Sequence, residues 1–380
     1  MSSAEPMRIA VDGSAIPRQM AGAGVYTYQL VRALAETADS HQLTVFARPG
    51  LFDELAAQQP RLQVVHIDQS SRVARLAWEQ TRLPSLLRRH EIDLLHSPHH
   101  HTPLATRRPR VVTFHDVTFL VLPDRYPTAR RLYMATVTRA SARVAGVIIT
   151  PSQTVRRDVI DRLGVPEERV VTIPDAAGPQ YIPVEDESIL DRLRQQYQLP
   201  SRYILSIGSL EPGKNRGRLI QAYAGLEGAG VDCPLVVAGR PAWRYEGDYE
   251  QVRRLGLQDQ VRFLGYVPDG DLPALYSGAT LLAFPSLYEG FGLPVLEAMS
   301  CGTPVVTANV AGTAEIAGDA ALLVDPRNVE ALAEAMGRLL SDDALRTDLR
   351  ARGLERAKQF SWQRTARETL SVYESAAAKS

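Results

Sequence analysis

The segment RYILSIGSLEPGKN, residues 202–215, decides how the chain is divided into domains. It opens with a short apolar run that indicates a strand, turns at a glycine and continues into a helix-compatible stretch. Runs of the same kind follow at residues 234–240, 261–267, 279–286 and 303–309. Alternation of this kind is typical of βα units in a parallel, doubly wound sheet.

An earlier set of strand-like runs occupies residues 7–13, 43–48, 92–97, 111–116 and 146–152. Ten strands in 380 residues exceed one domain, so we expect two Rossmann-like α/β domains. Residues 173–189 are rich in Pro, Gly and acids, which places the hinge near residues 175–195. The predicted domains are 1–183 and 184–361, and Ser361 is expected to cap a final amphipathic helix over 362–380.

The composition excludes several classes of protein. Hydrophobic residues make up 45% and charged residues 23% of the chain, as in soluble globular proteins. The 43 basic and 43 acidic residues balance, which argues against nucleic-acid binding. Cys233 and Cys301 form neither a zinc motif nor a disulfide framework. Without a signal peptide or an apolar run of transmembrane length, we expect a cytoplasmic protein.

The segment EGFGLPVLE, residues 289–297, is the strongest local signal of a ligand site. Its proline suits the first turn of a helix, and a helix N-terminus attracts an anion such as a diphosphate. Glu289 and Glu297 can accept hydrogen bonds from sugar hydroxyls. The alternative is a loop glutamate followed by an ordinary helical one. The backbone amides expected to face a ligand are those of Phe291, Gly292 and Leu293.

A second candidate is the turn GSLEPGKN, residues 208–215, where Lys214 is one of only three lysines in the chain. Amides around a glycine and a nearby ammonium group suit a phosphate, although the pattern is not a Walker A loop. A plain turn with an exposed lysine is the alternative. The segment GAGVYT, which contains Gly24, lacks a full dinucleotide fingerprint.

The histidines of HSPHHH, residues 96–101, suggest a metal, but the interleaved prolines and the missing HExxH favour an irregular loop. We therefore expect no metal site. His115 follows a predicted strand, where α/β sheets bind ligands. Asp269 and Asp271 form a DxD pattern that we interpret as turn and N-cap residues.

Together and in this order, these elements resemble the retaining GT-B glycosyltransferases of family 4 over essentially the whole chain. The shared motifs include the paired glutamates of residues 289–297, GSLEPGKN, LVVAG, FLGYV, GTPVV and GDAALLVDP. The N-terminal segments GAGVYTYQL, LLHSPHH and VVTFHD are similar to a subgroup that contains GDP-mannose-dependent mannosyltransferases.

The resemblance implies a cleft between the domains, with the acceptor on the N-terminal side and the nucleotide sugar on the C-terminal side. The final helix would cross back to the N-terminal domain. Lys214 would bind the diphosphate, Glu289 the donor sugar and Glu297 the ribose, while His115 would lie over the donor sugar and phosphate. The other implied donor contacts are Gly24, Gly208, Asn215, Gly239, Arg240, Val267, Gly290, Phe291, Gly292 and Leu293. No cofactor or metal is implied.

One departure from the family pattern concerns phosphate binding. Relatives commonly place an arginine before the lysine, where this chain has Gly213. Arg216, Arg218 and Arg240 are candidate replacements.

Two rival functions and the acceptor stay open. The rivals are a nucleotide-sugar epimerase that hydrolyses its donor and a non-catalytic subunit that binds sugar nucleotides. The expected acceptor is a glycan or a lipid-linked sugar. Residues 71–90 and 124–145 are rich in arginine and could contact an anionic membrane, with solvated helix faces as the alternative.

Overall fold

The computed structural model describes residues 6–18, 20, 22–38, 40–68, 71–227 and 232–378. The chain forms two compact units, one made of Met1–Asp175 with Ser361–Ser380 and the other of Ala176–Phe360. Residues 379–380, which belong to the predicted final helix, lie outside the described part of the chain.

The first unit contains a seven-stranded sheet in the order β3-β2-β1-β4-β5-β6-β7. All its strand pairs are parallel. The order reverses between β1 and β4, which makes this the switch point of a doubly wound sheet. Its strands are β1 (Arg8–Asp12), β2 (Gln42–Ala47), β3 (Leu62–His66), β4 (Leu94–Ser97), β5 (Arg110–Thr113), β6 (Val147–Thr150) and β7 (Val170–Thr172).

The second unit contains a six-stranded parallel sheet in the order β10-β9-β8-β11-β12-β13. Its switch point lies between β8 and β11. The strands are β8 (Ile204–Ile207), β9 (Leu235–Ala238), β10 (Val261–Gly265), β11 (Leu281–Phe284), β12 (Val305–Ala308) and β13 (Leu322–Val324). Two doubly wound parallel sheets confirm the predicted fold class.

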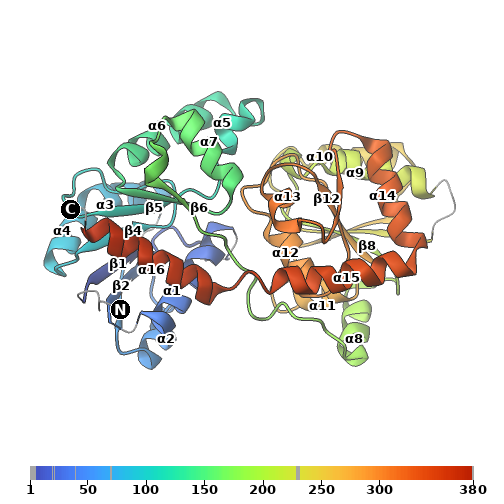
Figure 1. Cartoon of the computed structure of the whole chain (residues 1–380). Helices are drawn as coiled ribbons and strands as arrows, with labels where there is room; N and C mark the ends of the chain where they lie inside the picture. Colours follow the sequence, from blue (N-terminus) through green and yellow to red (C-terminus); the bar gives the residue numbers. More distant parts are fainter. Residues whose placement is uncertain are drawn as a thin grey trace. The chain divides into compact units, whose positions relative to one another are not determined.

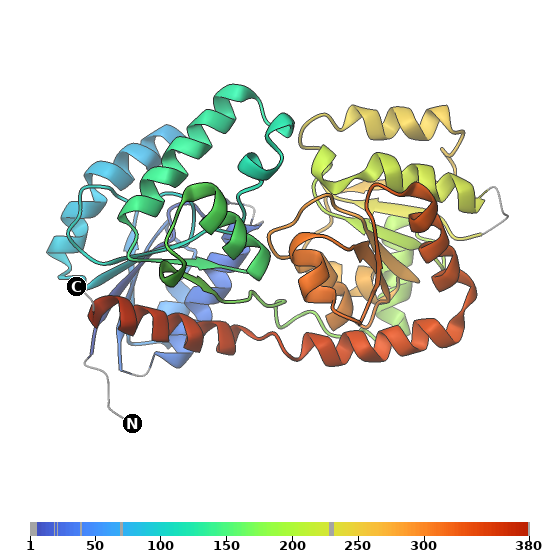
Figure 2. The same cartoon turned by 45° about the horizontal axis from the view of Figure 1, so that its top comes forward.

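Helices lie on both faces of each sheet (Figure 1 and Figure 2). The first unit has α1 (Ala23–Thr37), α2 (Asp53–Gln58), α3 (Arg72–Thr81), α4 (Leu83–Arg89), α5 (Thr118–Val121), α6 (Thr128–Val144), α7 (Gln153–Leu163) and α16 (Trp362–Ala378). The second has α8 (Glu187–Tyr197), α9 (Arg216–Glu227), α10 (Glu246–Arg254), α11 (Leu272–Ser277), α12 (Leu293–Ser300), α13 (Ala311–Ala317), α14 (Val329–Ser341) and α15 (Asp343–Ala357).

The central strands are apolar on both sides because each face is covered. In β11, Leu281 and Ala283 join a core cluster that includes residues of α9 and α14. The alternate residues Leu282 and Phe284 join a second cluster that includes residues of α11 and α12. This period of two explains why such strands appear as continuous apolar runs in the sequence.

The sequence prediction missed three strands, and all three are edge strands of their sheets. β3 and β13 are the outer strands of their sheets, and both are partly exposed. β7 is also an edge strand and has only three residues. Edge strands are short or mixed in polarity because they bury less surface, so their apolar pattern is weak.

The C-terminal helix α16 packs against α1 within the first unit, and the figures show it as the red helix beside α1. Ser361 caps it as predicted, because its hydroxyl accepts a hydrogen bond from the Arg364 amide at 3.2 Å. Farther along, the Tyr373 hydroxyl lies 2.6 Å from His96 Nδ1. His96 Nε2 lies 2.8 Å from the Thr113 hydroxyl. A buried polar chain therefore joins α16 to β4 and β5.

Replacing Tyr373 with phenylalanine should destabilise the first unit by about 1–3 kcal/mol. Both Tyr373 and His96 are fully buried, so the lost hydroxyl leaves Nδ1 without a partner or water. Urea unfolding measures the effect. Tyr28→Phe is the control, because the Tyr28 ring stacks on Phe52 and keeps that contact. Equal urea midpoints for the two variants would show that the hydrogen bond between Tyr373 and His96 contributes nothing to stability.

Candidate functional site

The candidate site in the second unit lies where β8 and β11 end, at the switch point of the sheet. The turn that contains Gly208 and Lys214 follows β8, and the segment from Glu289 to α12 follows β11. Ligands of open α/β sheets bind outside the carboxyl ends of the strands at such a point. The two strongest sequence motifs are therefore brought to one place.

Two glycines let the backbone turns after β8 and β9 meet. Gly239 has φ +150°, and a Cβ atom there would lie 1.8 Å from the Gly208 carbonyl oxygen. Gly208 itself has φ +117°. Both positions favour glycine because their backbone conformation is strained for other residues. At Gly239 the neighbour is also a backbone atom that cannot rotate away, whereas a Cβ at Gly208 would meet the Lys214 side chain at 3.3 Å.

Lys214 and Glu289 form an ion pair with 2.6 Å between Nζ and Oε1. The side chains are only 17% and 18% exposed. The Lys214 ammonium also lies 5.3 Å from the centre of the Phe284 ring. An ammonium has three N–H groups, so Lys214 can hold Glu289 and still donate to an anion. One charge-assisted hydrogen bond thus joins Lys214, the residue predicted to bind phosphate, to Glu289, the residue predicted to bind the sugar.

The start of α12 adds backbone donors to this cation. Gly292, at φ +112°, precedes the first helical residue Leu293. Pro294 has no N–H, and the Val295 amide donates to the Gly292 carbonyl at 2.9 Å. The amides at this helix start that can donate to a ligand are therefore those of Gly292 and Leu293. The Phe291 side chain packs in the core at 6.0 Å from the Phe360 ring, which leaves only its backbone for ligand binding. Gly312 packs closely on Gly290, where a Cβ would lie 2.5 Å from the Gly290 carbonyl oxygen.

Glu297 lies in the second turn of α12, where two tyrosines hold its carboxylate. The Tyr276 hydroxyl donates to Oε2 at 2.7 Å, and Tyr181 donates a further hydrogen bond. Burial raises the pKa of Glu297 to about 7, although both tyrosine hydrogen bonds act to lower it. The group is therefore poised between its ionised and protonated forms at neutral pH. Sequence reasoning missed both tyrosines.

The polar residues after Lys214 hold the loop together. The Asn215 amide donates to the carbonyls of Pro285 and Pro326, and its oxygen accepts a hydrogen bond from Arg218. Arg216 is 1% exposed and donates to the carbonyls of Gly208 and Ser209. Burial lowers the Arg216 pKa to about 10, still charged at neutral pH. Through these contacts Asn215 and Arg216 hold the backbone of the loop in place, and these contacts do not require a ligand.

Arg240 and Val267 follow β9 and β10 at the same edge of the sheet. The Arg240 guanidinium lies 3.9 Å from the centre of the Tyr266 ring, in a cation–π contact. Val267 is buried in the core, so its side chain faces away from solvent. Of the three arginines proposed to replace the missing cation at Gly213, Arg216 is buried, and Arg218 and Arg240 are both partly exposed.

The two predicted residues of the first unit lie near its own strand ends. His115 follows β5, and its Nε2–H donates to the Pro98 carbonyl at 3.1 Å. Burial lowers the pKa of His115 to about 4, so the ring is neutral at pH 7. The Tyr26 ring packs edge-on against it at 4.6 Å. Gly24 is the second residue of α1, where a Cβ would lie 2.8 Å from the Pro17 ring.

A buried cluster of Asp12, Glu79 and His99 has the residue types of a metal site. Its ligand atoms lie within 4.8 Å of one another. Arg75 already donates to Glu79 Oε2 at 3.0 Å, and Gln80 donates to Oε1. The charges of the two carboxylates are thus offset in part by Arg75 without an ion. The sequence could not reveal this cluster, since its members lie far apart in the chain.

The DxD pattern has a different role from the predicted cap. Asp271 stands at the N-cap position of α11, but its side chain makes no capping hydrogen bond. Its carboxylate instead accepts hydrogen bonds from Tyr197 at 2.7 Å and Gln196 at 3.1 Å. The expectation of a capping Asp271 side chain was wrong because a partner on α8 competes for the carboxylate.

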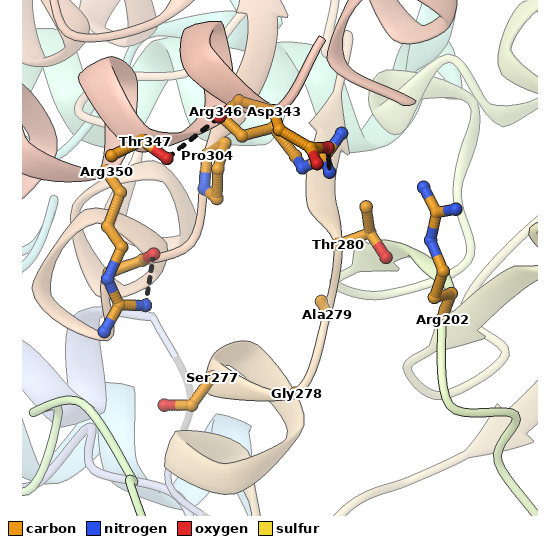
Figure 3. Close-up of a pocket in the computed structure, with 11 residues that line it drawn as sticks. Arg202, Ser277, Gly278, Ala279, Thr280, Pro304, Asp343, Arg346, Thr347 and Arg350 are labelled. Atoms are coloured by element: carbon orange, nitrogen blue, oxygen red, sulfur yellow. Dashed lines mark hydrogen bonds and ion pairs between the residues drawn. The ribbon is translucent and has the colours of Figure 1, made fainter. Parts of the chain in front are cut away.

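A cavity of about 460 Å³ in the second unit lies at the opposite edge of the sheet (Figure 3). Arg202, Thr280 and Pro304 line it, and they precede β8, β11 and β12. Arg202 and Arg350 donate to the carbonyls of Leu340 and Gly302, at or beyond the ends of α14 and α12. None of the predicted site residues lines this cavity. It is therefore separate from the candidate site.

In the described ranges of the chain, no helix has both the length and the apolar character needed to cross a bilayer.

Comparison with known proteins gives consistent matches to both units. The family described as Glycosyl transferases group 1 matches residues 191–356. The family described as Glycosyltransferase Family 4 matches residues 20–177. The O-antigen chain mannosyltransferase B of Escherichia coli is 35% identical over 384 residues, which cover 97% of this chain and 99% of that protein. The serotype-specific mannosyltransferase WbdA of Escherichia coli is 34% identical over 269 residues, which cover 67% of this chain and 32% of that protein.

Solved structures share the fold at low sequence identity. A sucrose-phosphate synthase from Thermosynechococcus elongatus superposes with a TM-score of 0.78 at 23% identity, covering 98% of this chain and 100% of that one. Anabaena Alr3699/HepE in complex with UDP and glucose gives a TM-score of 0.77 at 22% identity, with coverage of 97% and 100%.

Proposed function

The chain belongs to the glycosyltransferases of family 4, and from that membership we propose that it transfers mannose from GDP-mannose to a glycan or lipid-linked acceptor. We further propose that the anomeric configuration of the sugar is retained. The mannosyl assignment draws on the relative from Escherichia coli, which is similar along its whole length and is named as a mannosyltransferase of the O-antigen chain.

The observation that carries the proposal is the Lys214–Glu289 pair at the switch point of the second sheet. The proposal places the donor diphosphate at the Lys214 ammonium and the amides that start α12. Glu289 would then accept hydrogen bonds from hydroxyls of the donor sugar. Glu297, held by Tyr276, would accept them from the ribose.

Charge development gives these groups their catalytic role. Breaking the bond between the sugar and the diphosphate builds negative charge on the leaving phosphate oxygen. A fixed cation and fixed amides stabilise that charge without reorganisation at the moment of reaction. Lys214 can supply the positive charge that a metal supplies elsewhere, so we propose that transfer needs no metal. His115, neutral at pH 7, would serve as a hydrogen-bonding group rather than as a second cation.

Incubation with GDP-mannose, UDP-glucose and ADP-glucose in turn, with a mannosyl oligosaccharide on a lipid aglycone as acceptor, tests this function. The proposal expects a mannosylated product from GDP-mannose alone, at an unchanged rate in EDTA. Proton NMR should find the same anomeric configuration in product and donor. Release of a free sugar isomer without acceptor would favour the epimerase alternative, and nucleotide binding without any turnover would favour the non-catalytic subunit.

A surface of α3 and α6 suits a membrane-bound acceptor, and we propose that it contacts an anionic bilayer. The Arg72 guanidinium on α3 lies 5.5 Å from the centre of the Tyr133 ring on α6, so the two helices are in contact at this point. Val73 is 76% exposed and Leu132 is 58% exposed beside the exposed arginines Arg72 and Arg130. Apolar side chains among cations are the pattern of interfacial helices.

Reversing two charges on this surface should weaken vesicle binding. Each basic residue near an anionic membrane contributes about 1 kcal/mol, so the pair Arg72→Glu and Arg130→Glu should lower the partition coefficient on phosphatidylglycerol vesicles at least about tenfold. The control pair is Arg253→Glu and Arg254→Glu, exposed on α10 of the second unit. Equal losses for both pairs would contradict a specific surface.

A further inference from the structure

The Glu297 carboxylate is held in place from two different parts of the second unit. Tyr276 belongs to α11, and Tyr181 belongs to the segment that precedes α8. Both rings lie in the core of this unit, with Tyr276 fully buried and Tyr181 8% exposed. Their ring centres are 5.9 Å apart in an edge-on contact. Packing thus fixes the position of both phenol groups.

The hydrogen bonds have a defined direction. Burial raises the pKa of both tyrosines, so both phenols stay protonated and can only donate to the carboxylate. A carboxylate has about four acceptor positions, and the tyrosines occupy two of them. The remaining positions can accept a pair of neighbouring hydroxyl groups. Side chains of a helix lean toward its N-terminus, which directs Glu297 toward the start of α12.

We propose that Tyr276 and Tyr181 are positioning residues that fix the Glu297 carboxylate for recognition of the two ribose hydroxyls of the donor nucleotide. This inference rests on the proposed function, because it takes the diphosphate at Lys214 and the start of α12 as given. It adds a specificity: the pair of tyrosines lets the site distinguish a ribonucleotide from a deoxyribonucleotide.

Titration of Glu297 gives the inference a second readout. The groups that face its carboxylate are Tyr276, Tyr181, Asp269 and Cys301. Of these, Asp269 raises the Glu297 pKa and the two tyrosine hydrogen bonds lower it. Protonation removes acceptor capacity, so ribonucleotide affinity should fall as the pH drops below about 7. Removing a tyrosine hydroxyl should shift this fall to higher pH.

The test compares GDP with 2′,3′-dideoxy-GDP by calorimetry at pH 8 on the full chain. Wild type should bind GDP roughly tenfold or more tighter than the dideoxy analogue, the size of a hydrogen bond to a charged group. In Tyr276→Phe the ratio should fall to about threefold or less, with little change in the affinity for the analogue. Tyr181→Phe should also reduce the ratio of the two affinities. This variant replaces Tyr276→Phe in the test if Tyr276→Phe does not fold.

Tyr203→Phe is the matched control for this experiment. Tyr203 is also a buried tyrosine of the second unit, and its hydroxyl donates to the Leu275 carbonyl at 2.7 Å. Its loss should lower stability but leave the ratio and its pH dependence unchanged. An equal loss of affinity for both nucleotides in Tyr276→Phe and Tyr181→Phe would overturn the inference.

The same experiment separates this inference from the proposed donor. The UDP and ADP pairs of ribo and dideoxy nucleotides are measured alongside the GDP pair. If UDP or ADP binds best, the GDP assignment fails. The ribo and dideoxy forms of that nucleotide then still test the role of the two tyrosines. If no nucleotide binds to wild type, the inference and the proposed function both fail.

Discussion

Replacing Lys214 with alanine should lower the rate of sugar transfer by a factor of roughly 10 to 1,000. A hydrogen bond to a charged group contributes about 1.5–3 kcal/mol, and a preorganised donor to a developing negative charge contributes up to about 4 kcal/mol. The substitution also leaves Glu289, only 18% exposed, without its 2.6 Å partner. Steady-state release of the nucleoside diphosphate measures the effect.

Lys358→Ala is a matched control, because the Lys358 side chain is 72% exposed and pairs only at the surface with Glu355. Exposed ion pairs contribute at most about 1 kcal/mol, so this variant should keep wild-type activity. A Lys214→Ala enzyme that also keeps wild-type activity would remove Lys214 from the mechanism.

Replacing Gly239 with alanine should destabilise the second unit by about 3–5 kcal/mol, from overpacking and backbone strain together. The added Cβ would lie 1.8 Å from the Gly208 carbonyl oxygen, and no side-chain rotation relieves a clash with backbone. The turn after β8 would have to move, and Lys214 would move with it. Urea unfolding and nucleotide binding should therefore both be affected.

The control for this variant is Gly247→Ala in α10, where an added Cβ meets nothing within 4 Å. Alanine favours a helix, so stability should stay within about 1 kcal/mol of wild type or rise. If Gly239→Ala proved as stable as Gly247→Ala, the close approach of the two turns would be wrong.

The central strands and the two motifs, one with Lys214 and one with Glu289 and Glu297, could be predicted because their signals are local. A strand such as β11 is buried on both faces and stands out as an apolar run. Lys214 and Glu289 each follow such a strand, and the resemblance assigns both to the donor site; the carboxyl ends of the parallel strands then bring them together. The edge strands β3 and β13 were missed because their partial exposure breaks the pattern.

The contacts around Glu297 and within the Lys214 loop could not be predicted, since they depend on distant residues. Tyr181 and Tyr276 look like core residues in the sequence, and only the packing of the second unit brings them to Glu297. The resemblance implies a donor contact for Asn215, and Arg216 is a candidate phosphate cation, but the sequence does not show which groups hold these two side chains. Their partners are backbone carbonyls, which no side-chain pattern reveals.

The most direct test of the account is the thermal stability of the chain with GDP, UDP or ADP. Ligand at 100 times its Kd adds about 2.7 kcal/mol of stability. The account predicts a shift with GDP that disappears in Lys214→Ala and persists in Lys358→Ala. A chain that gains no stability from any of the three nucleotides, or gains as much after loss of Lys214, would contradict a donor site at the ends of β8 and β11.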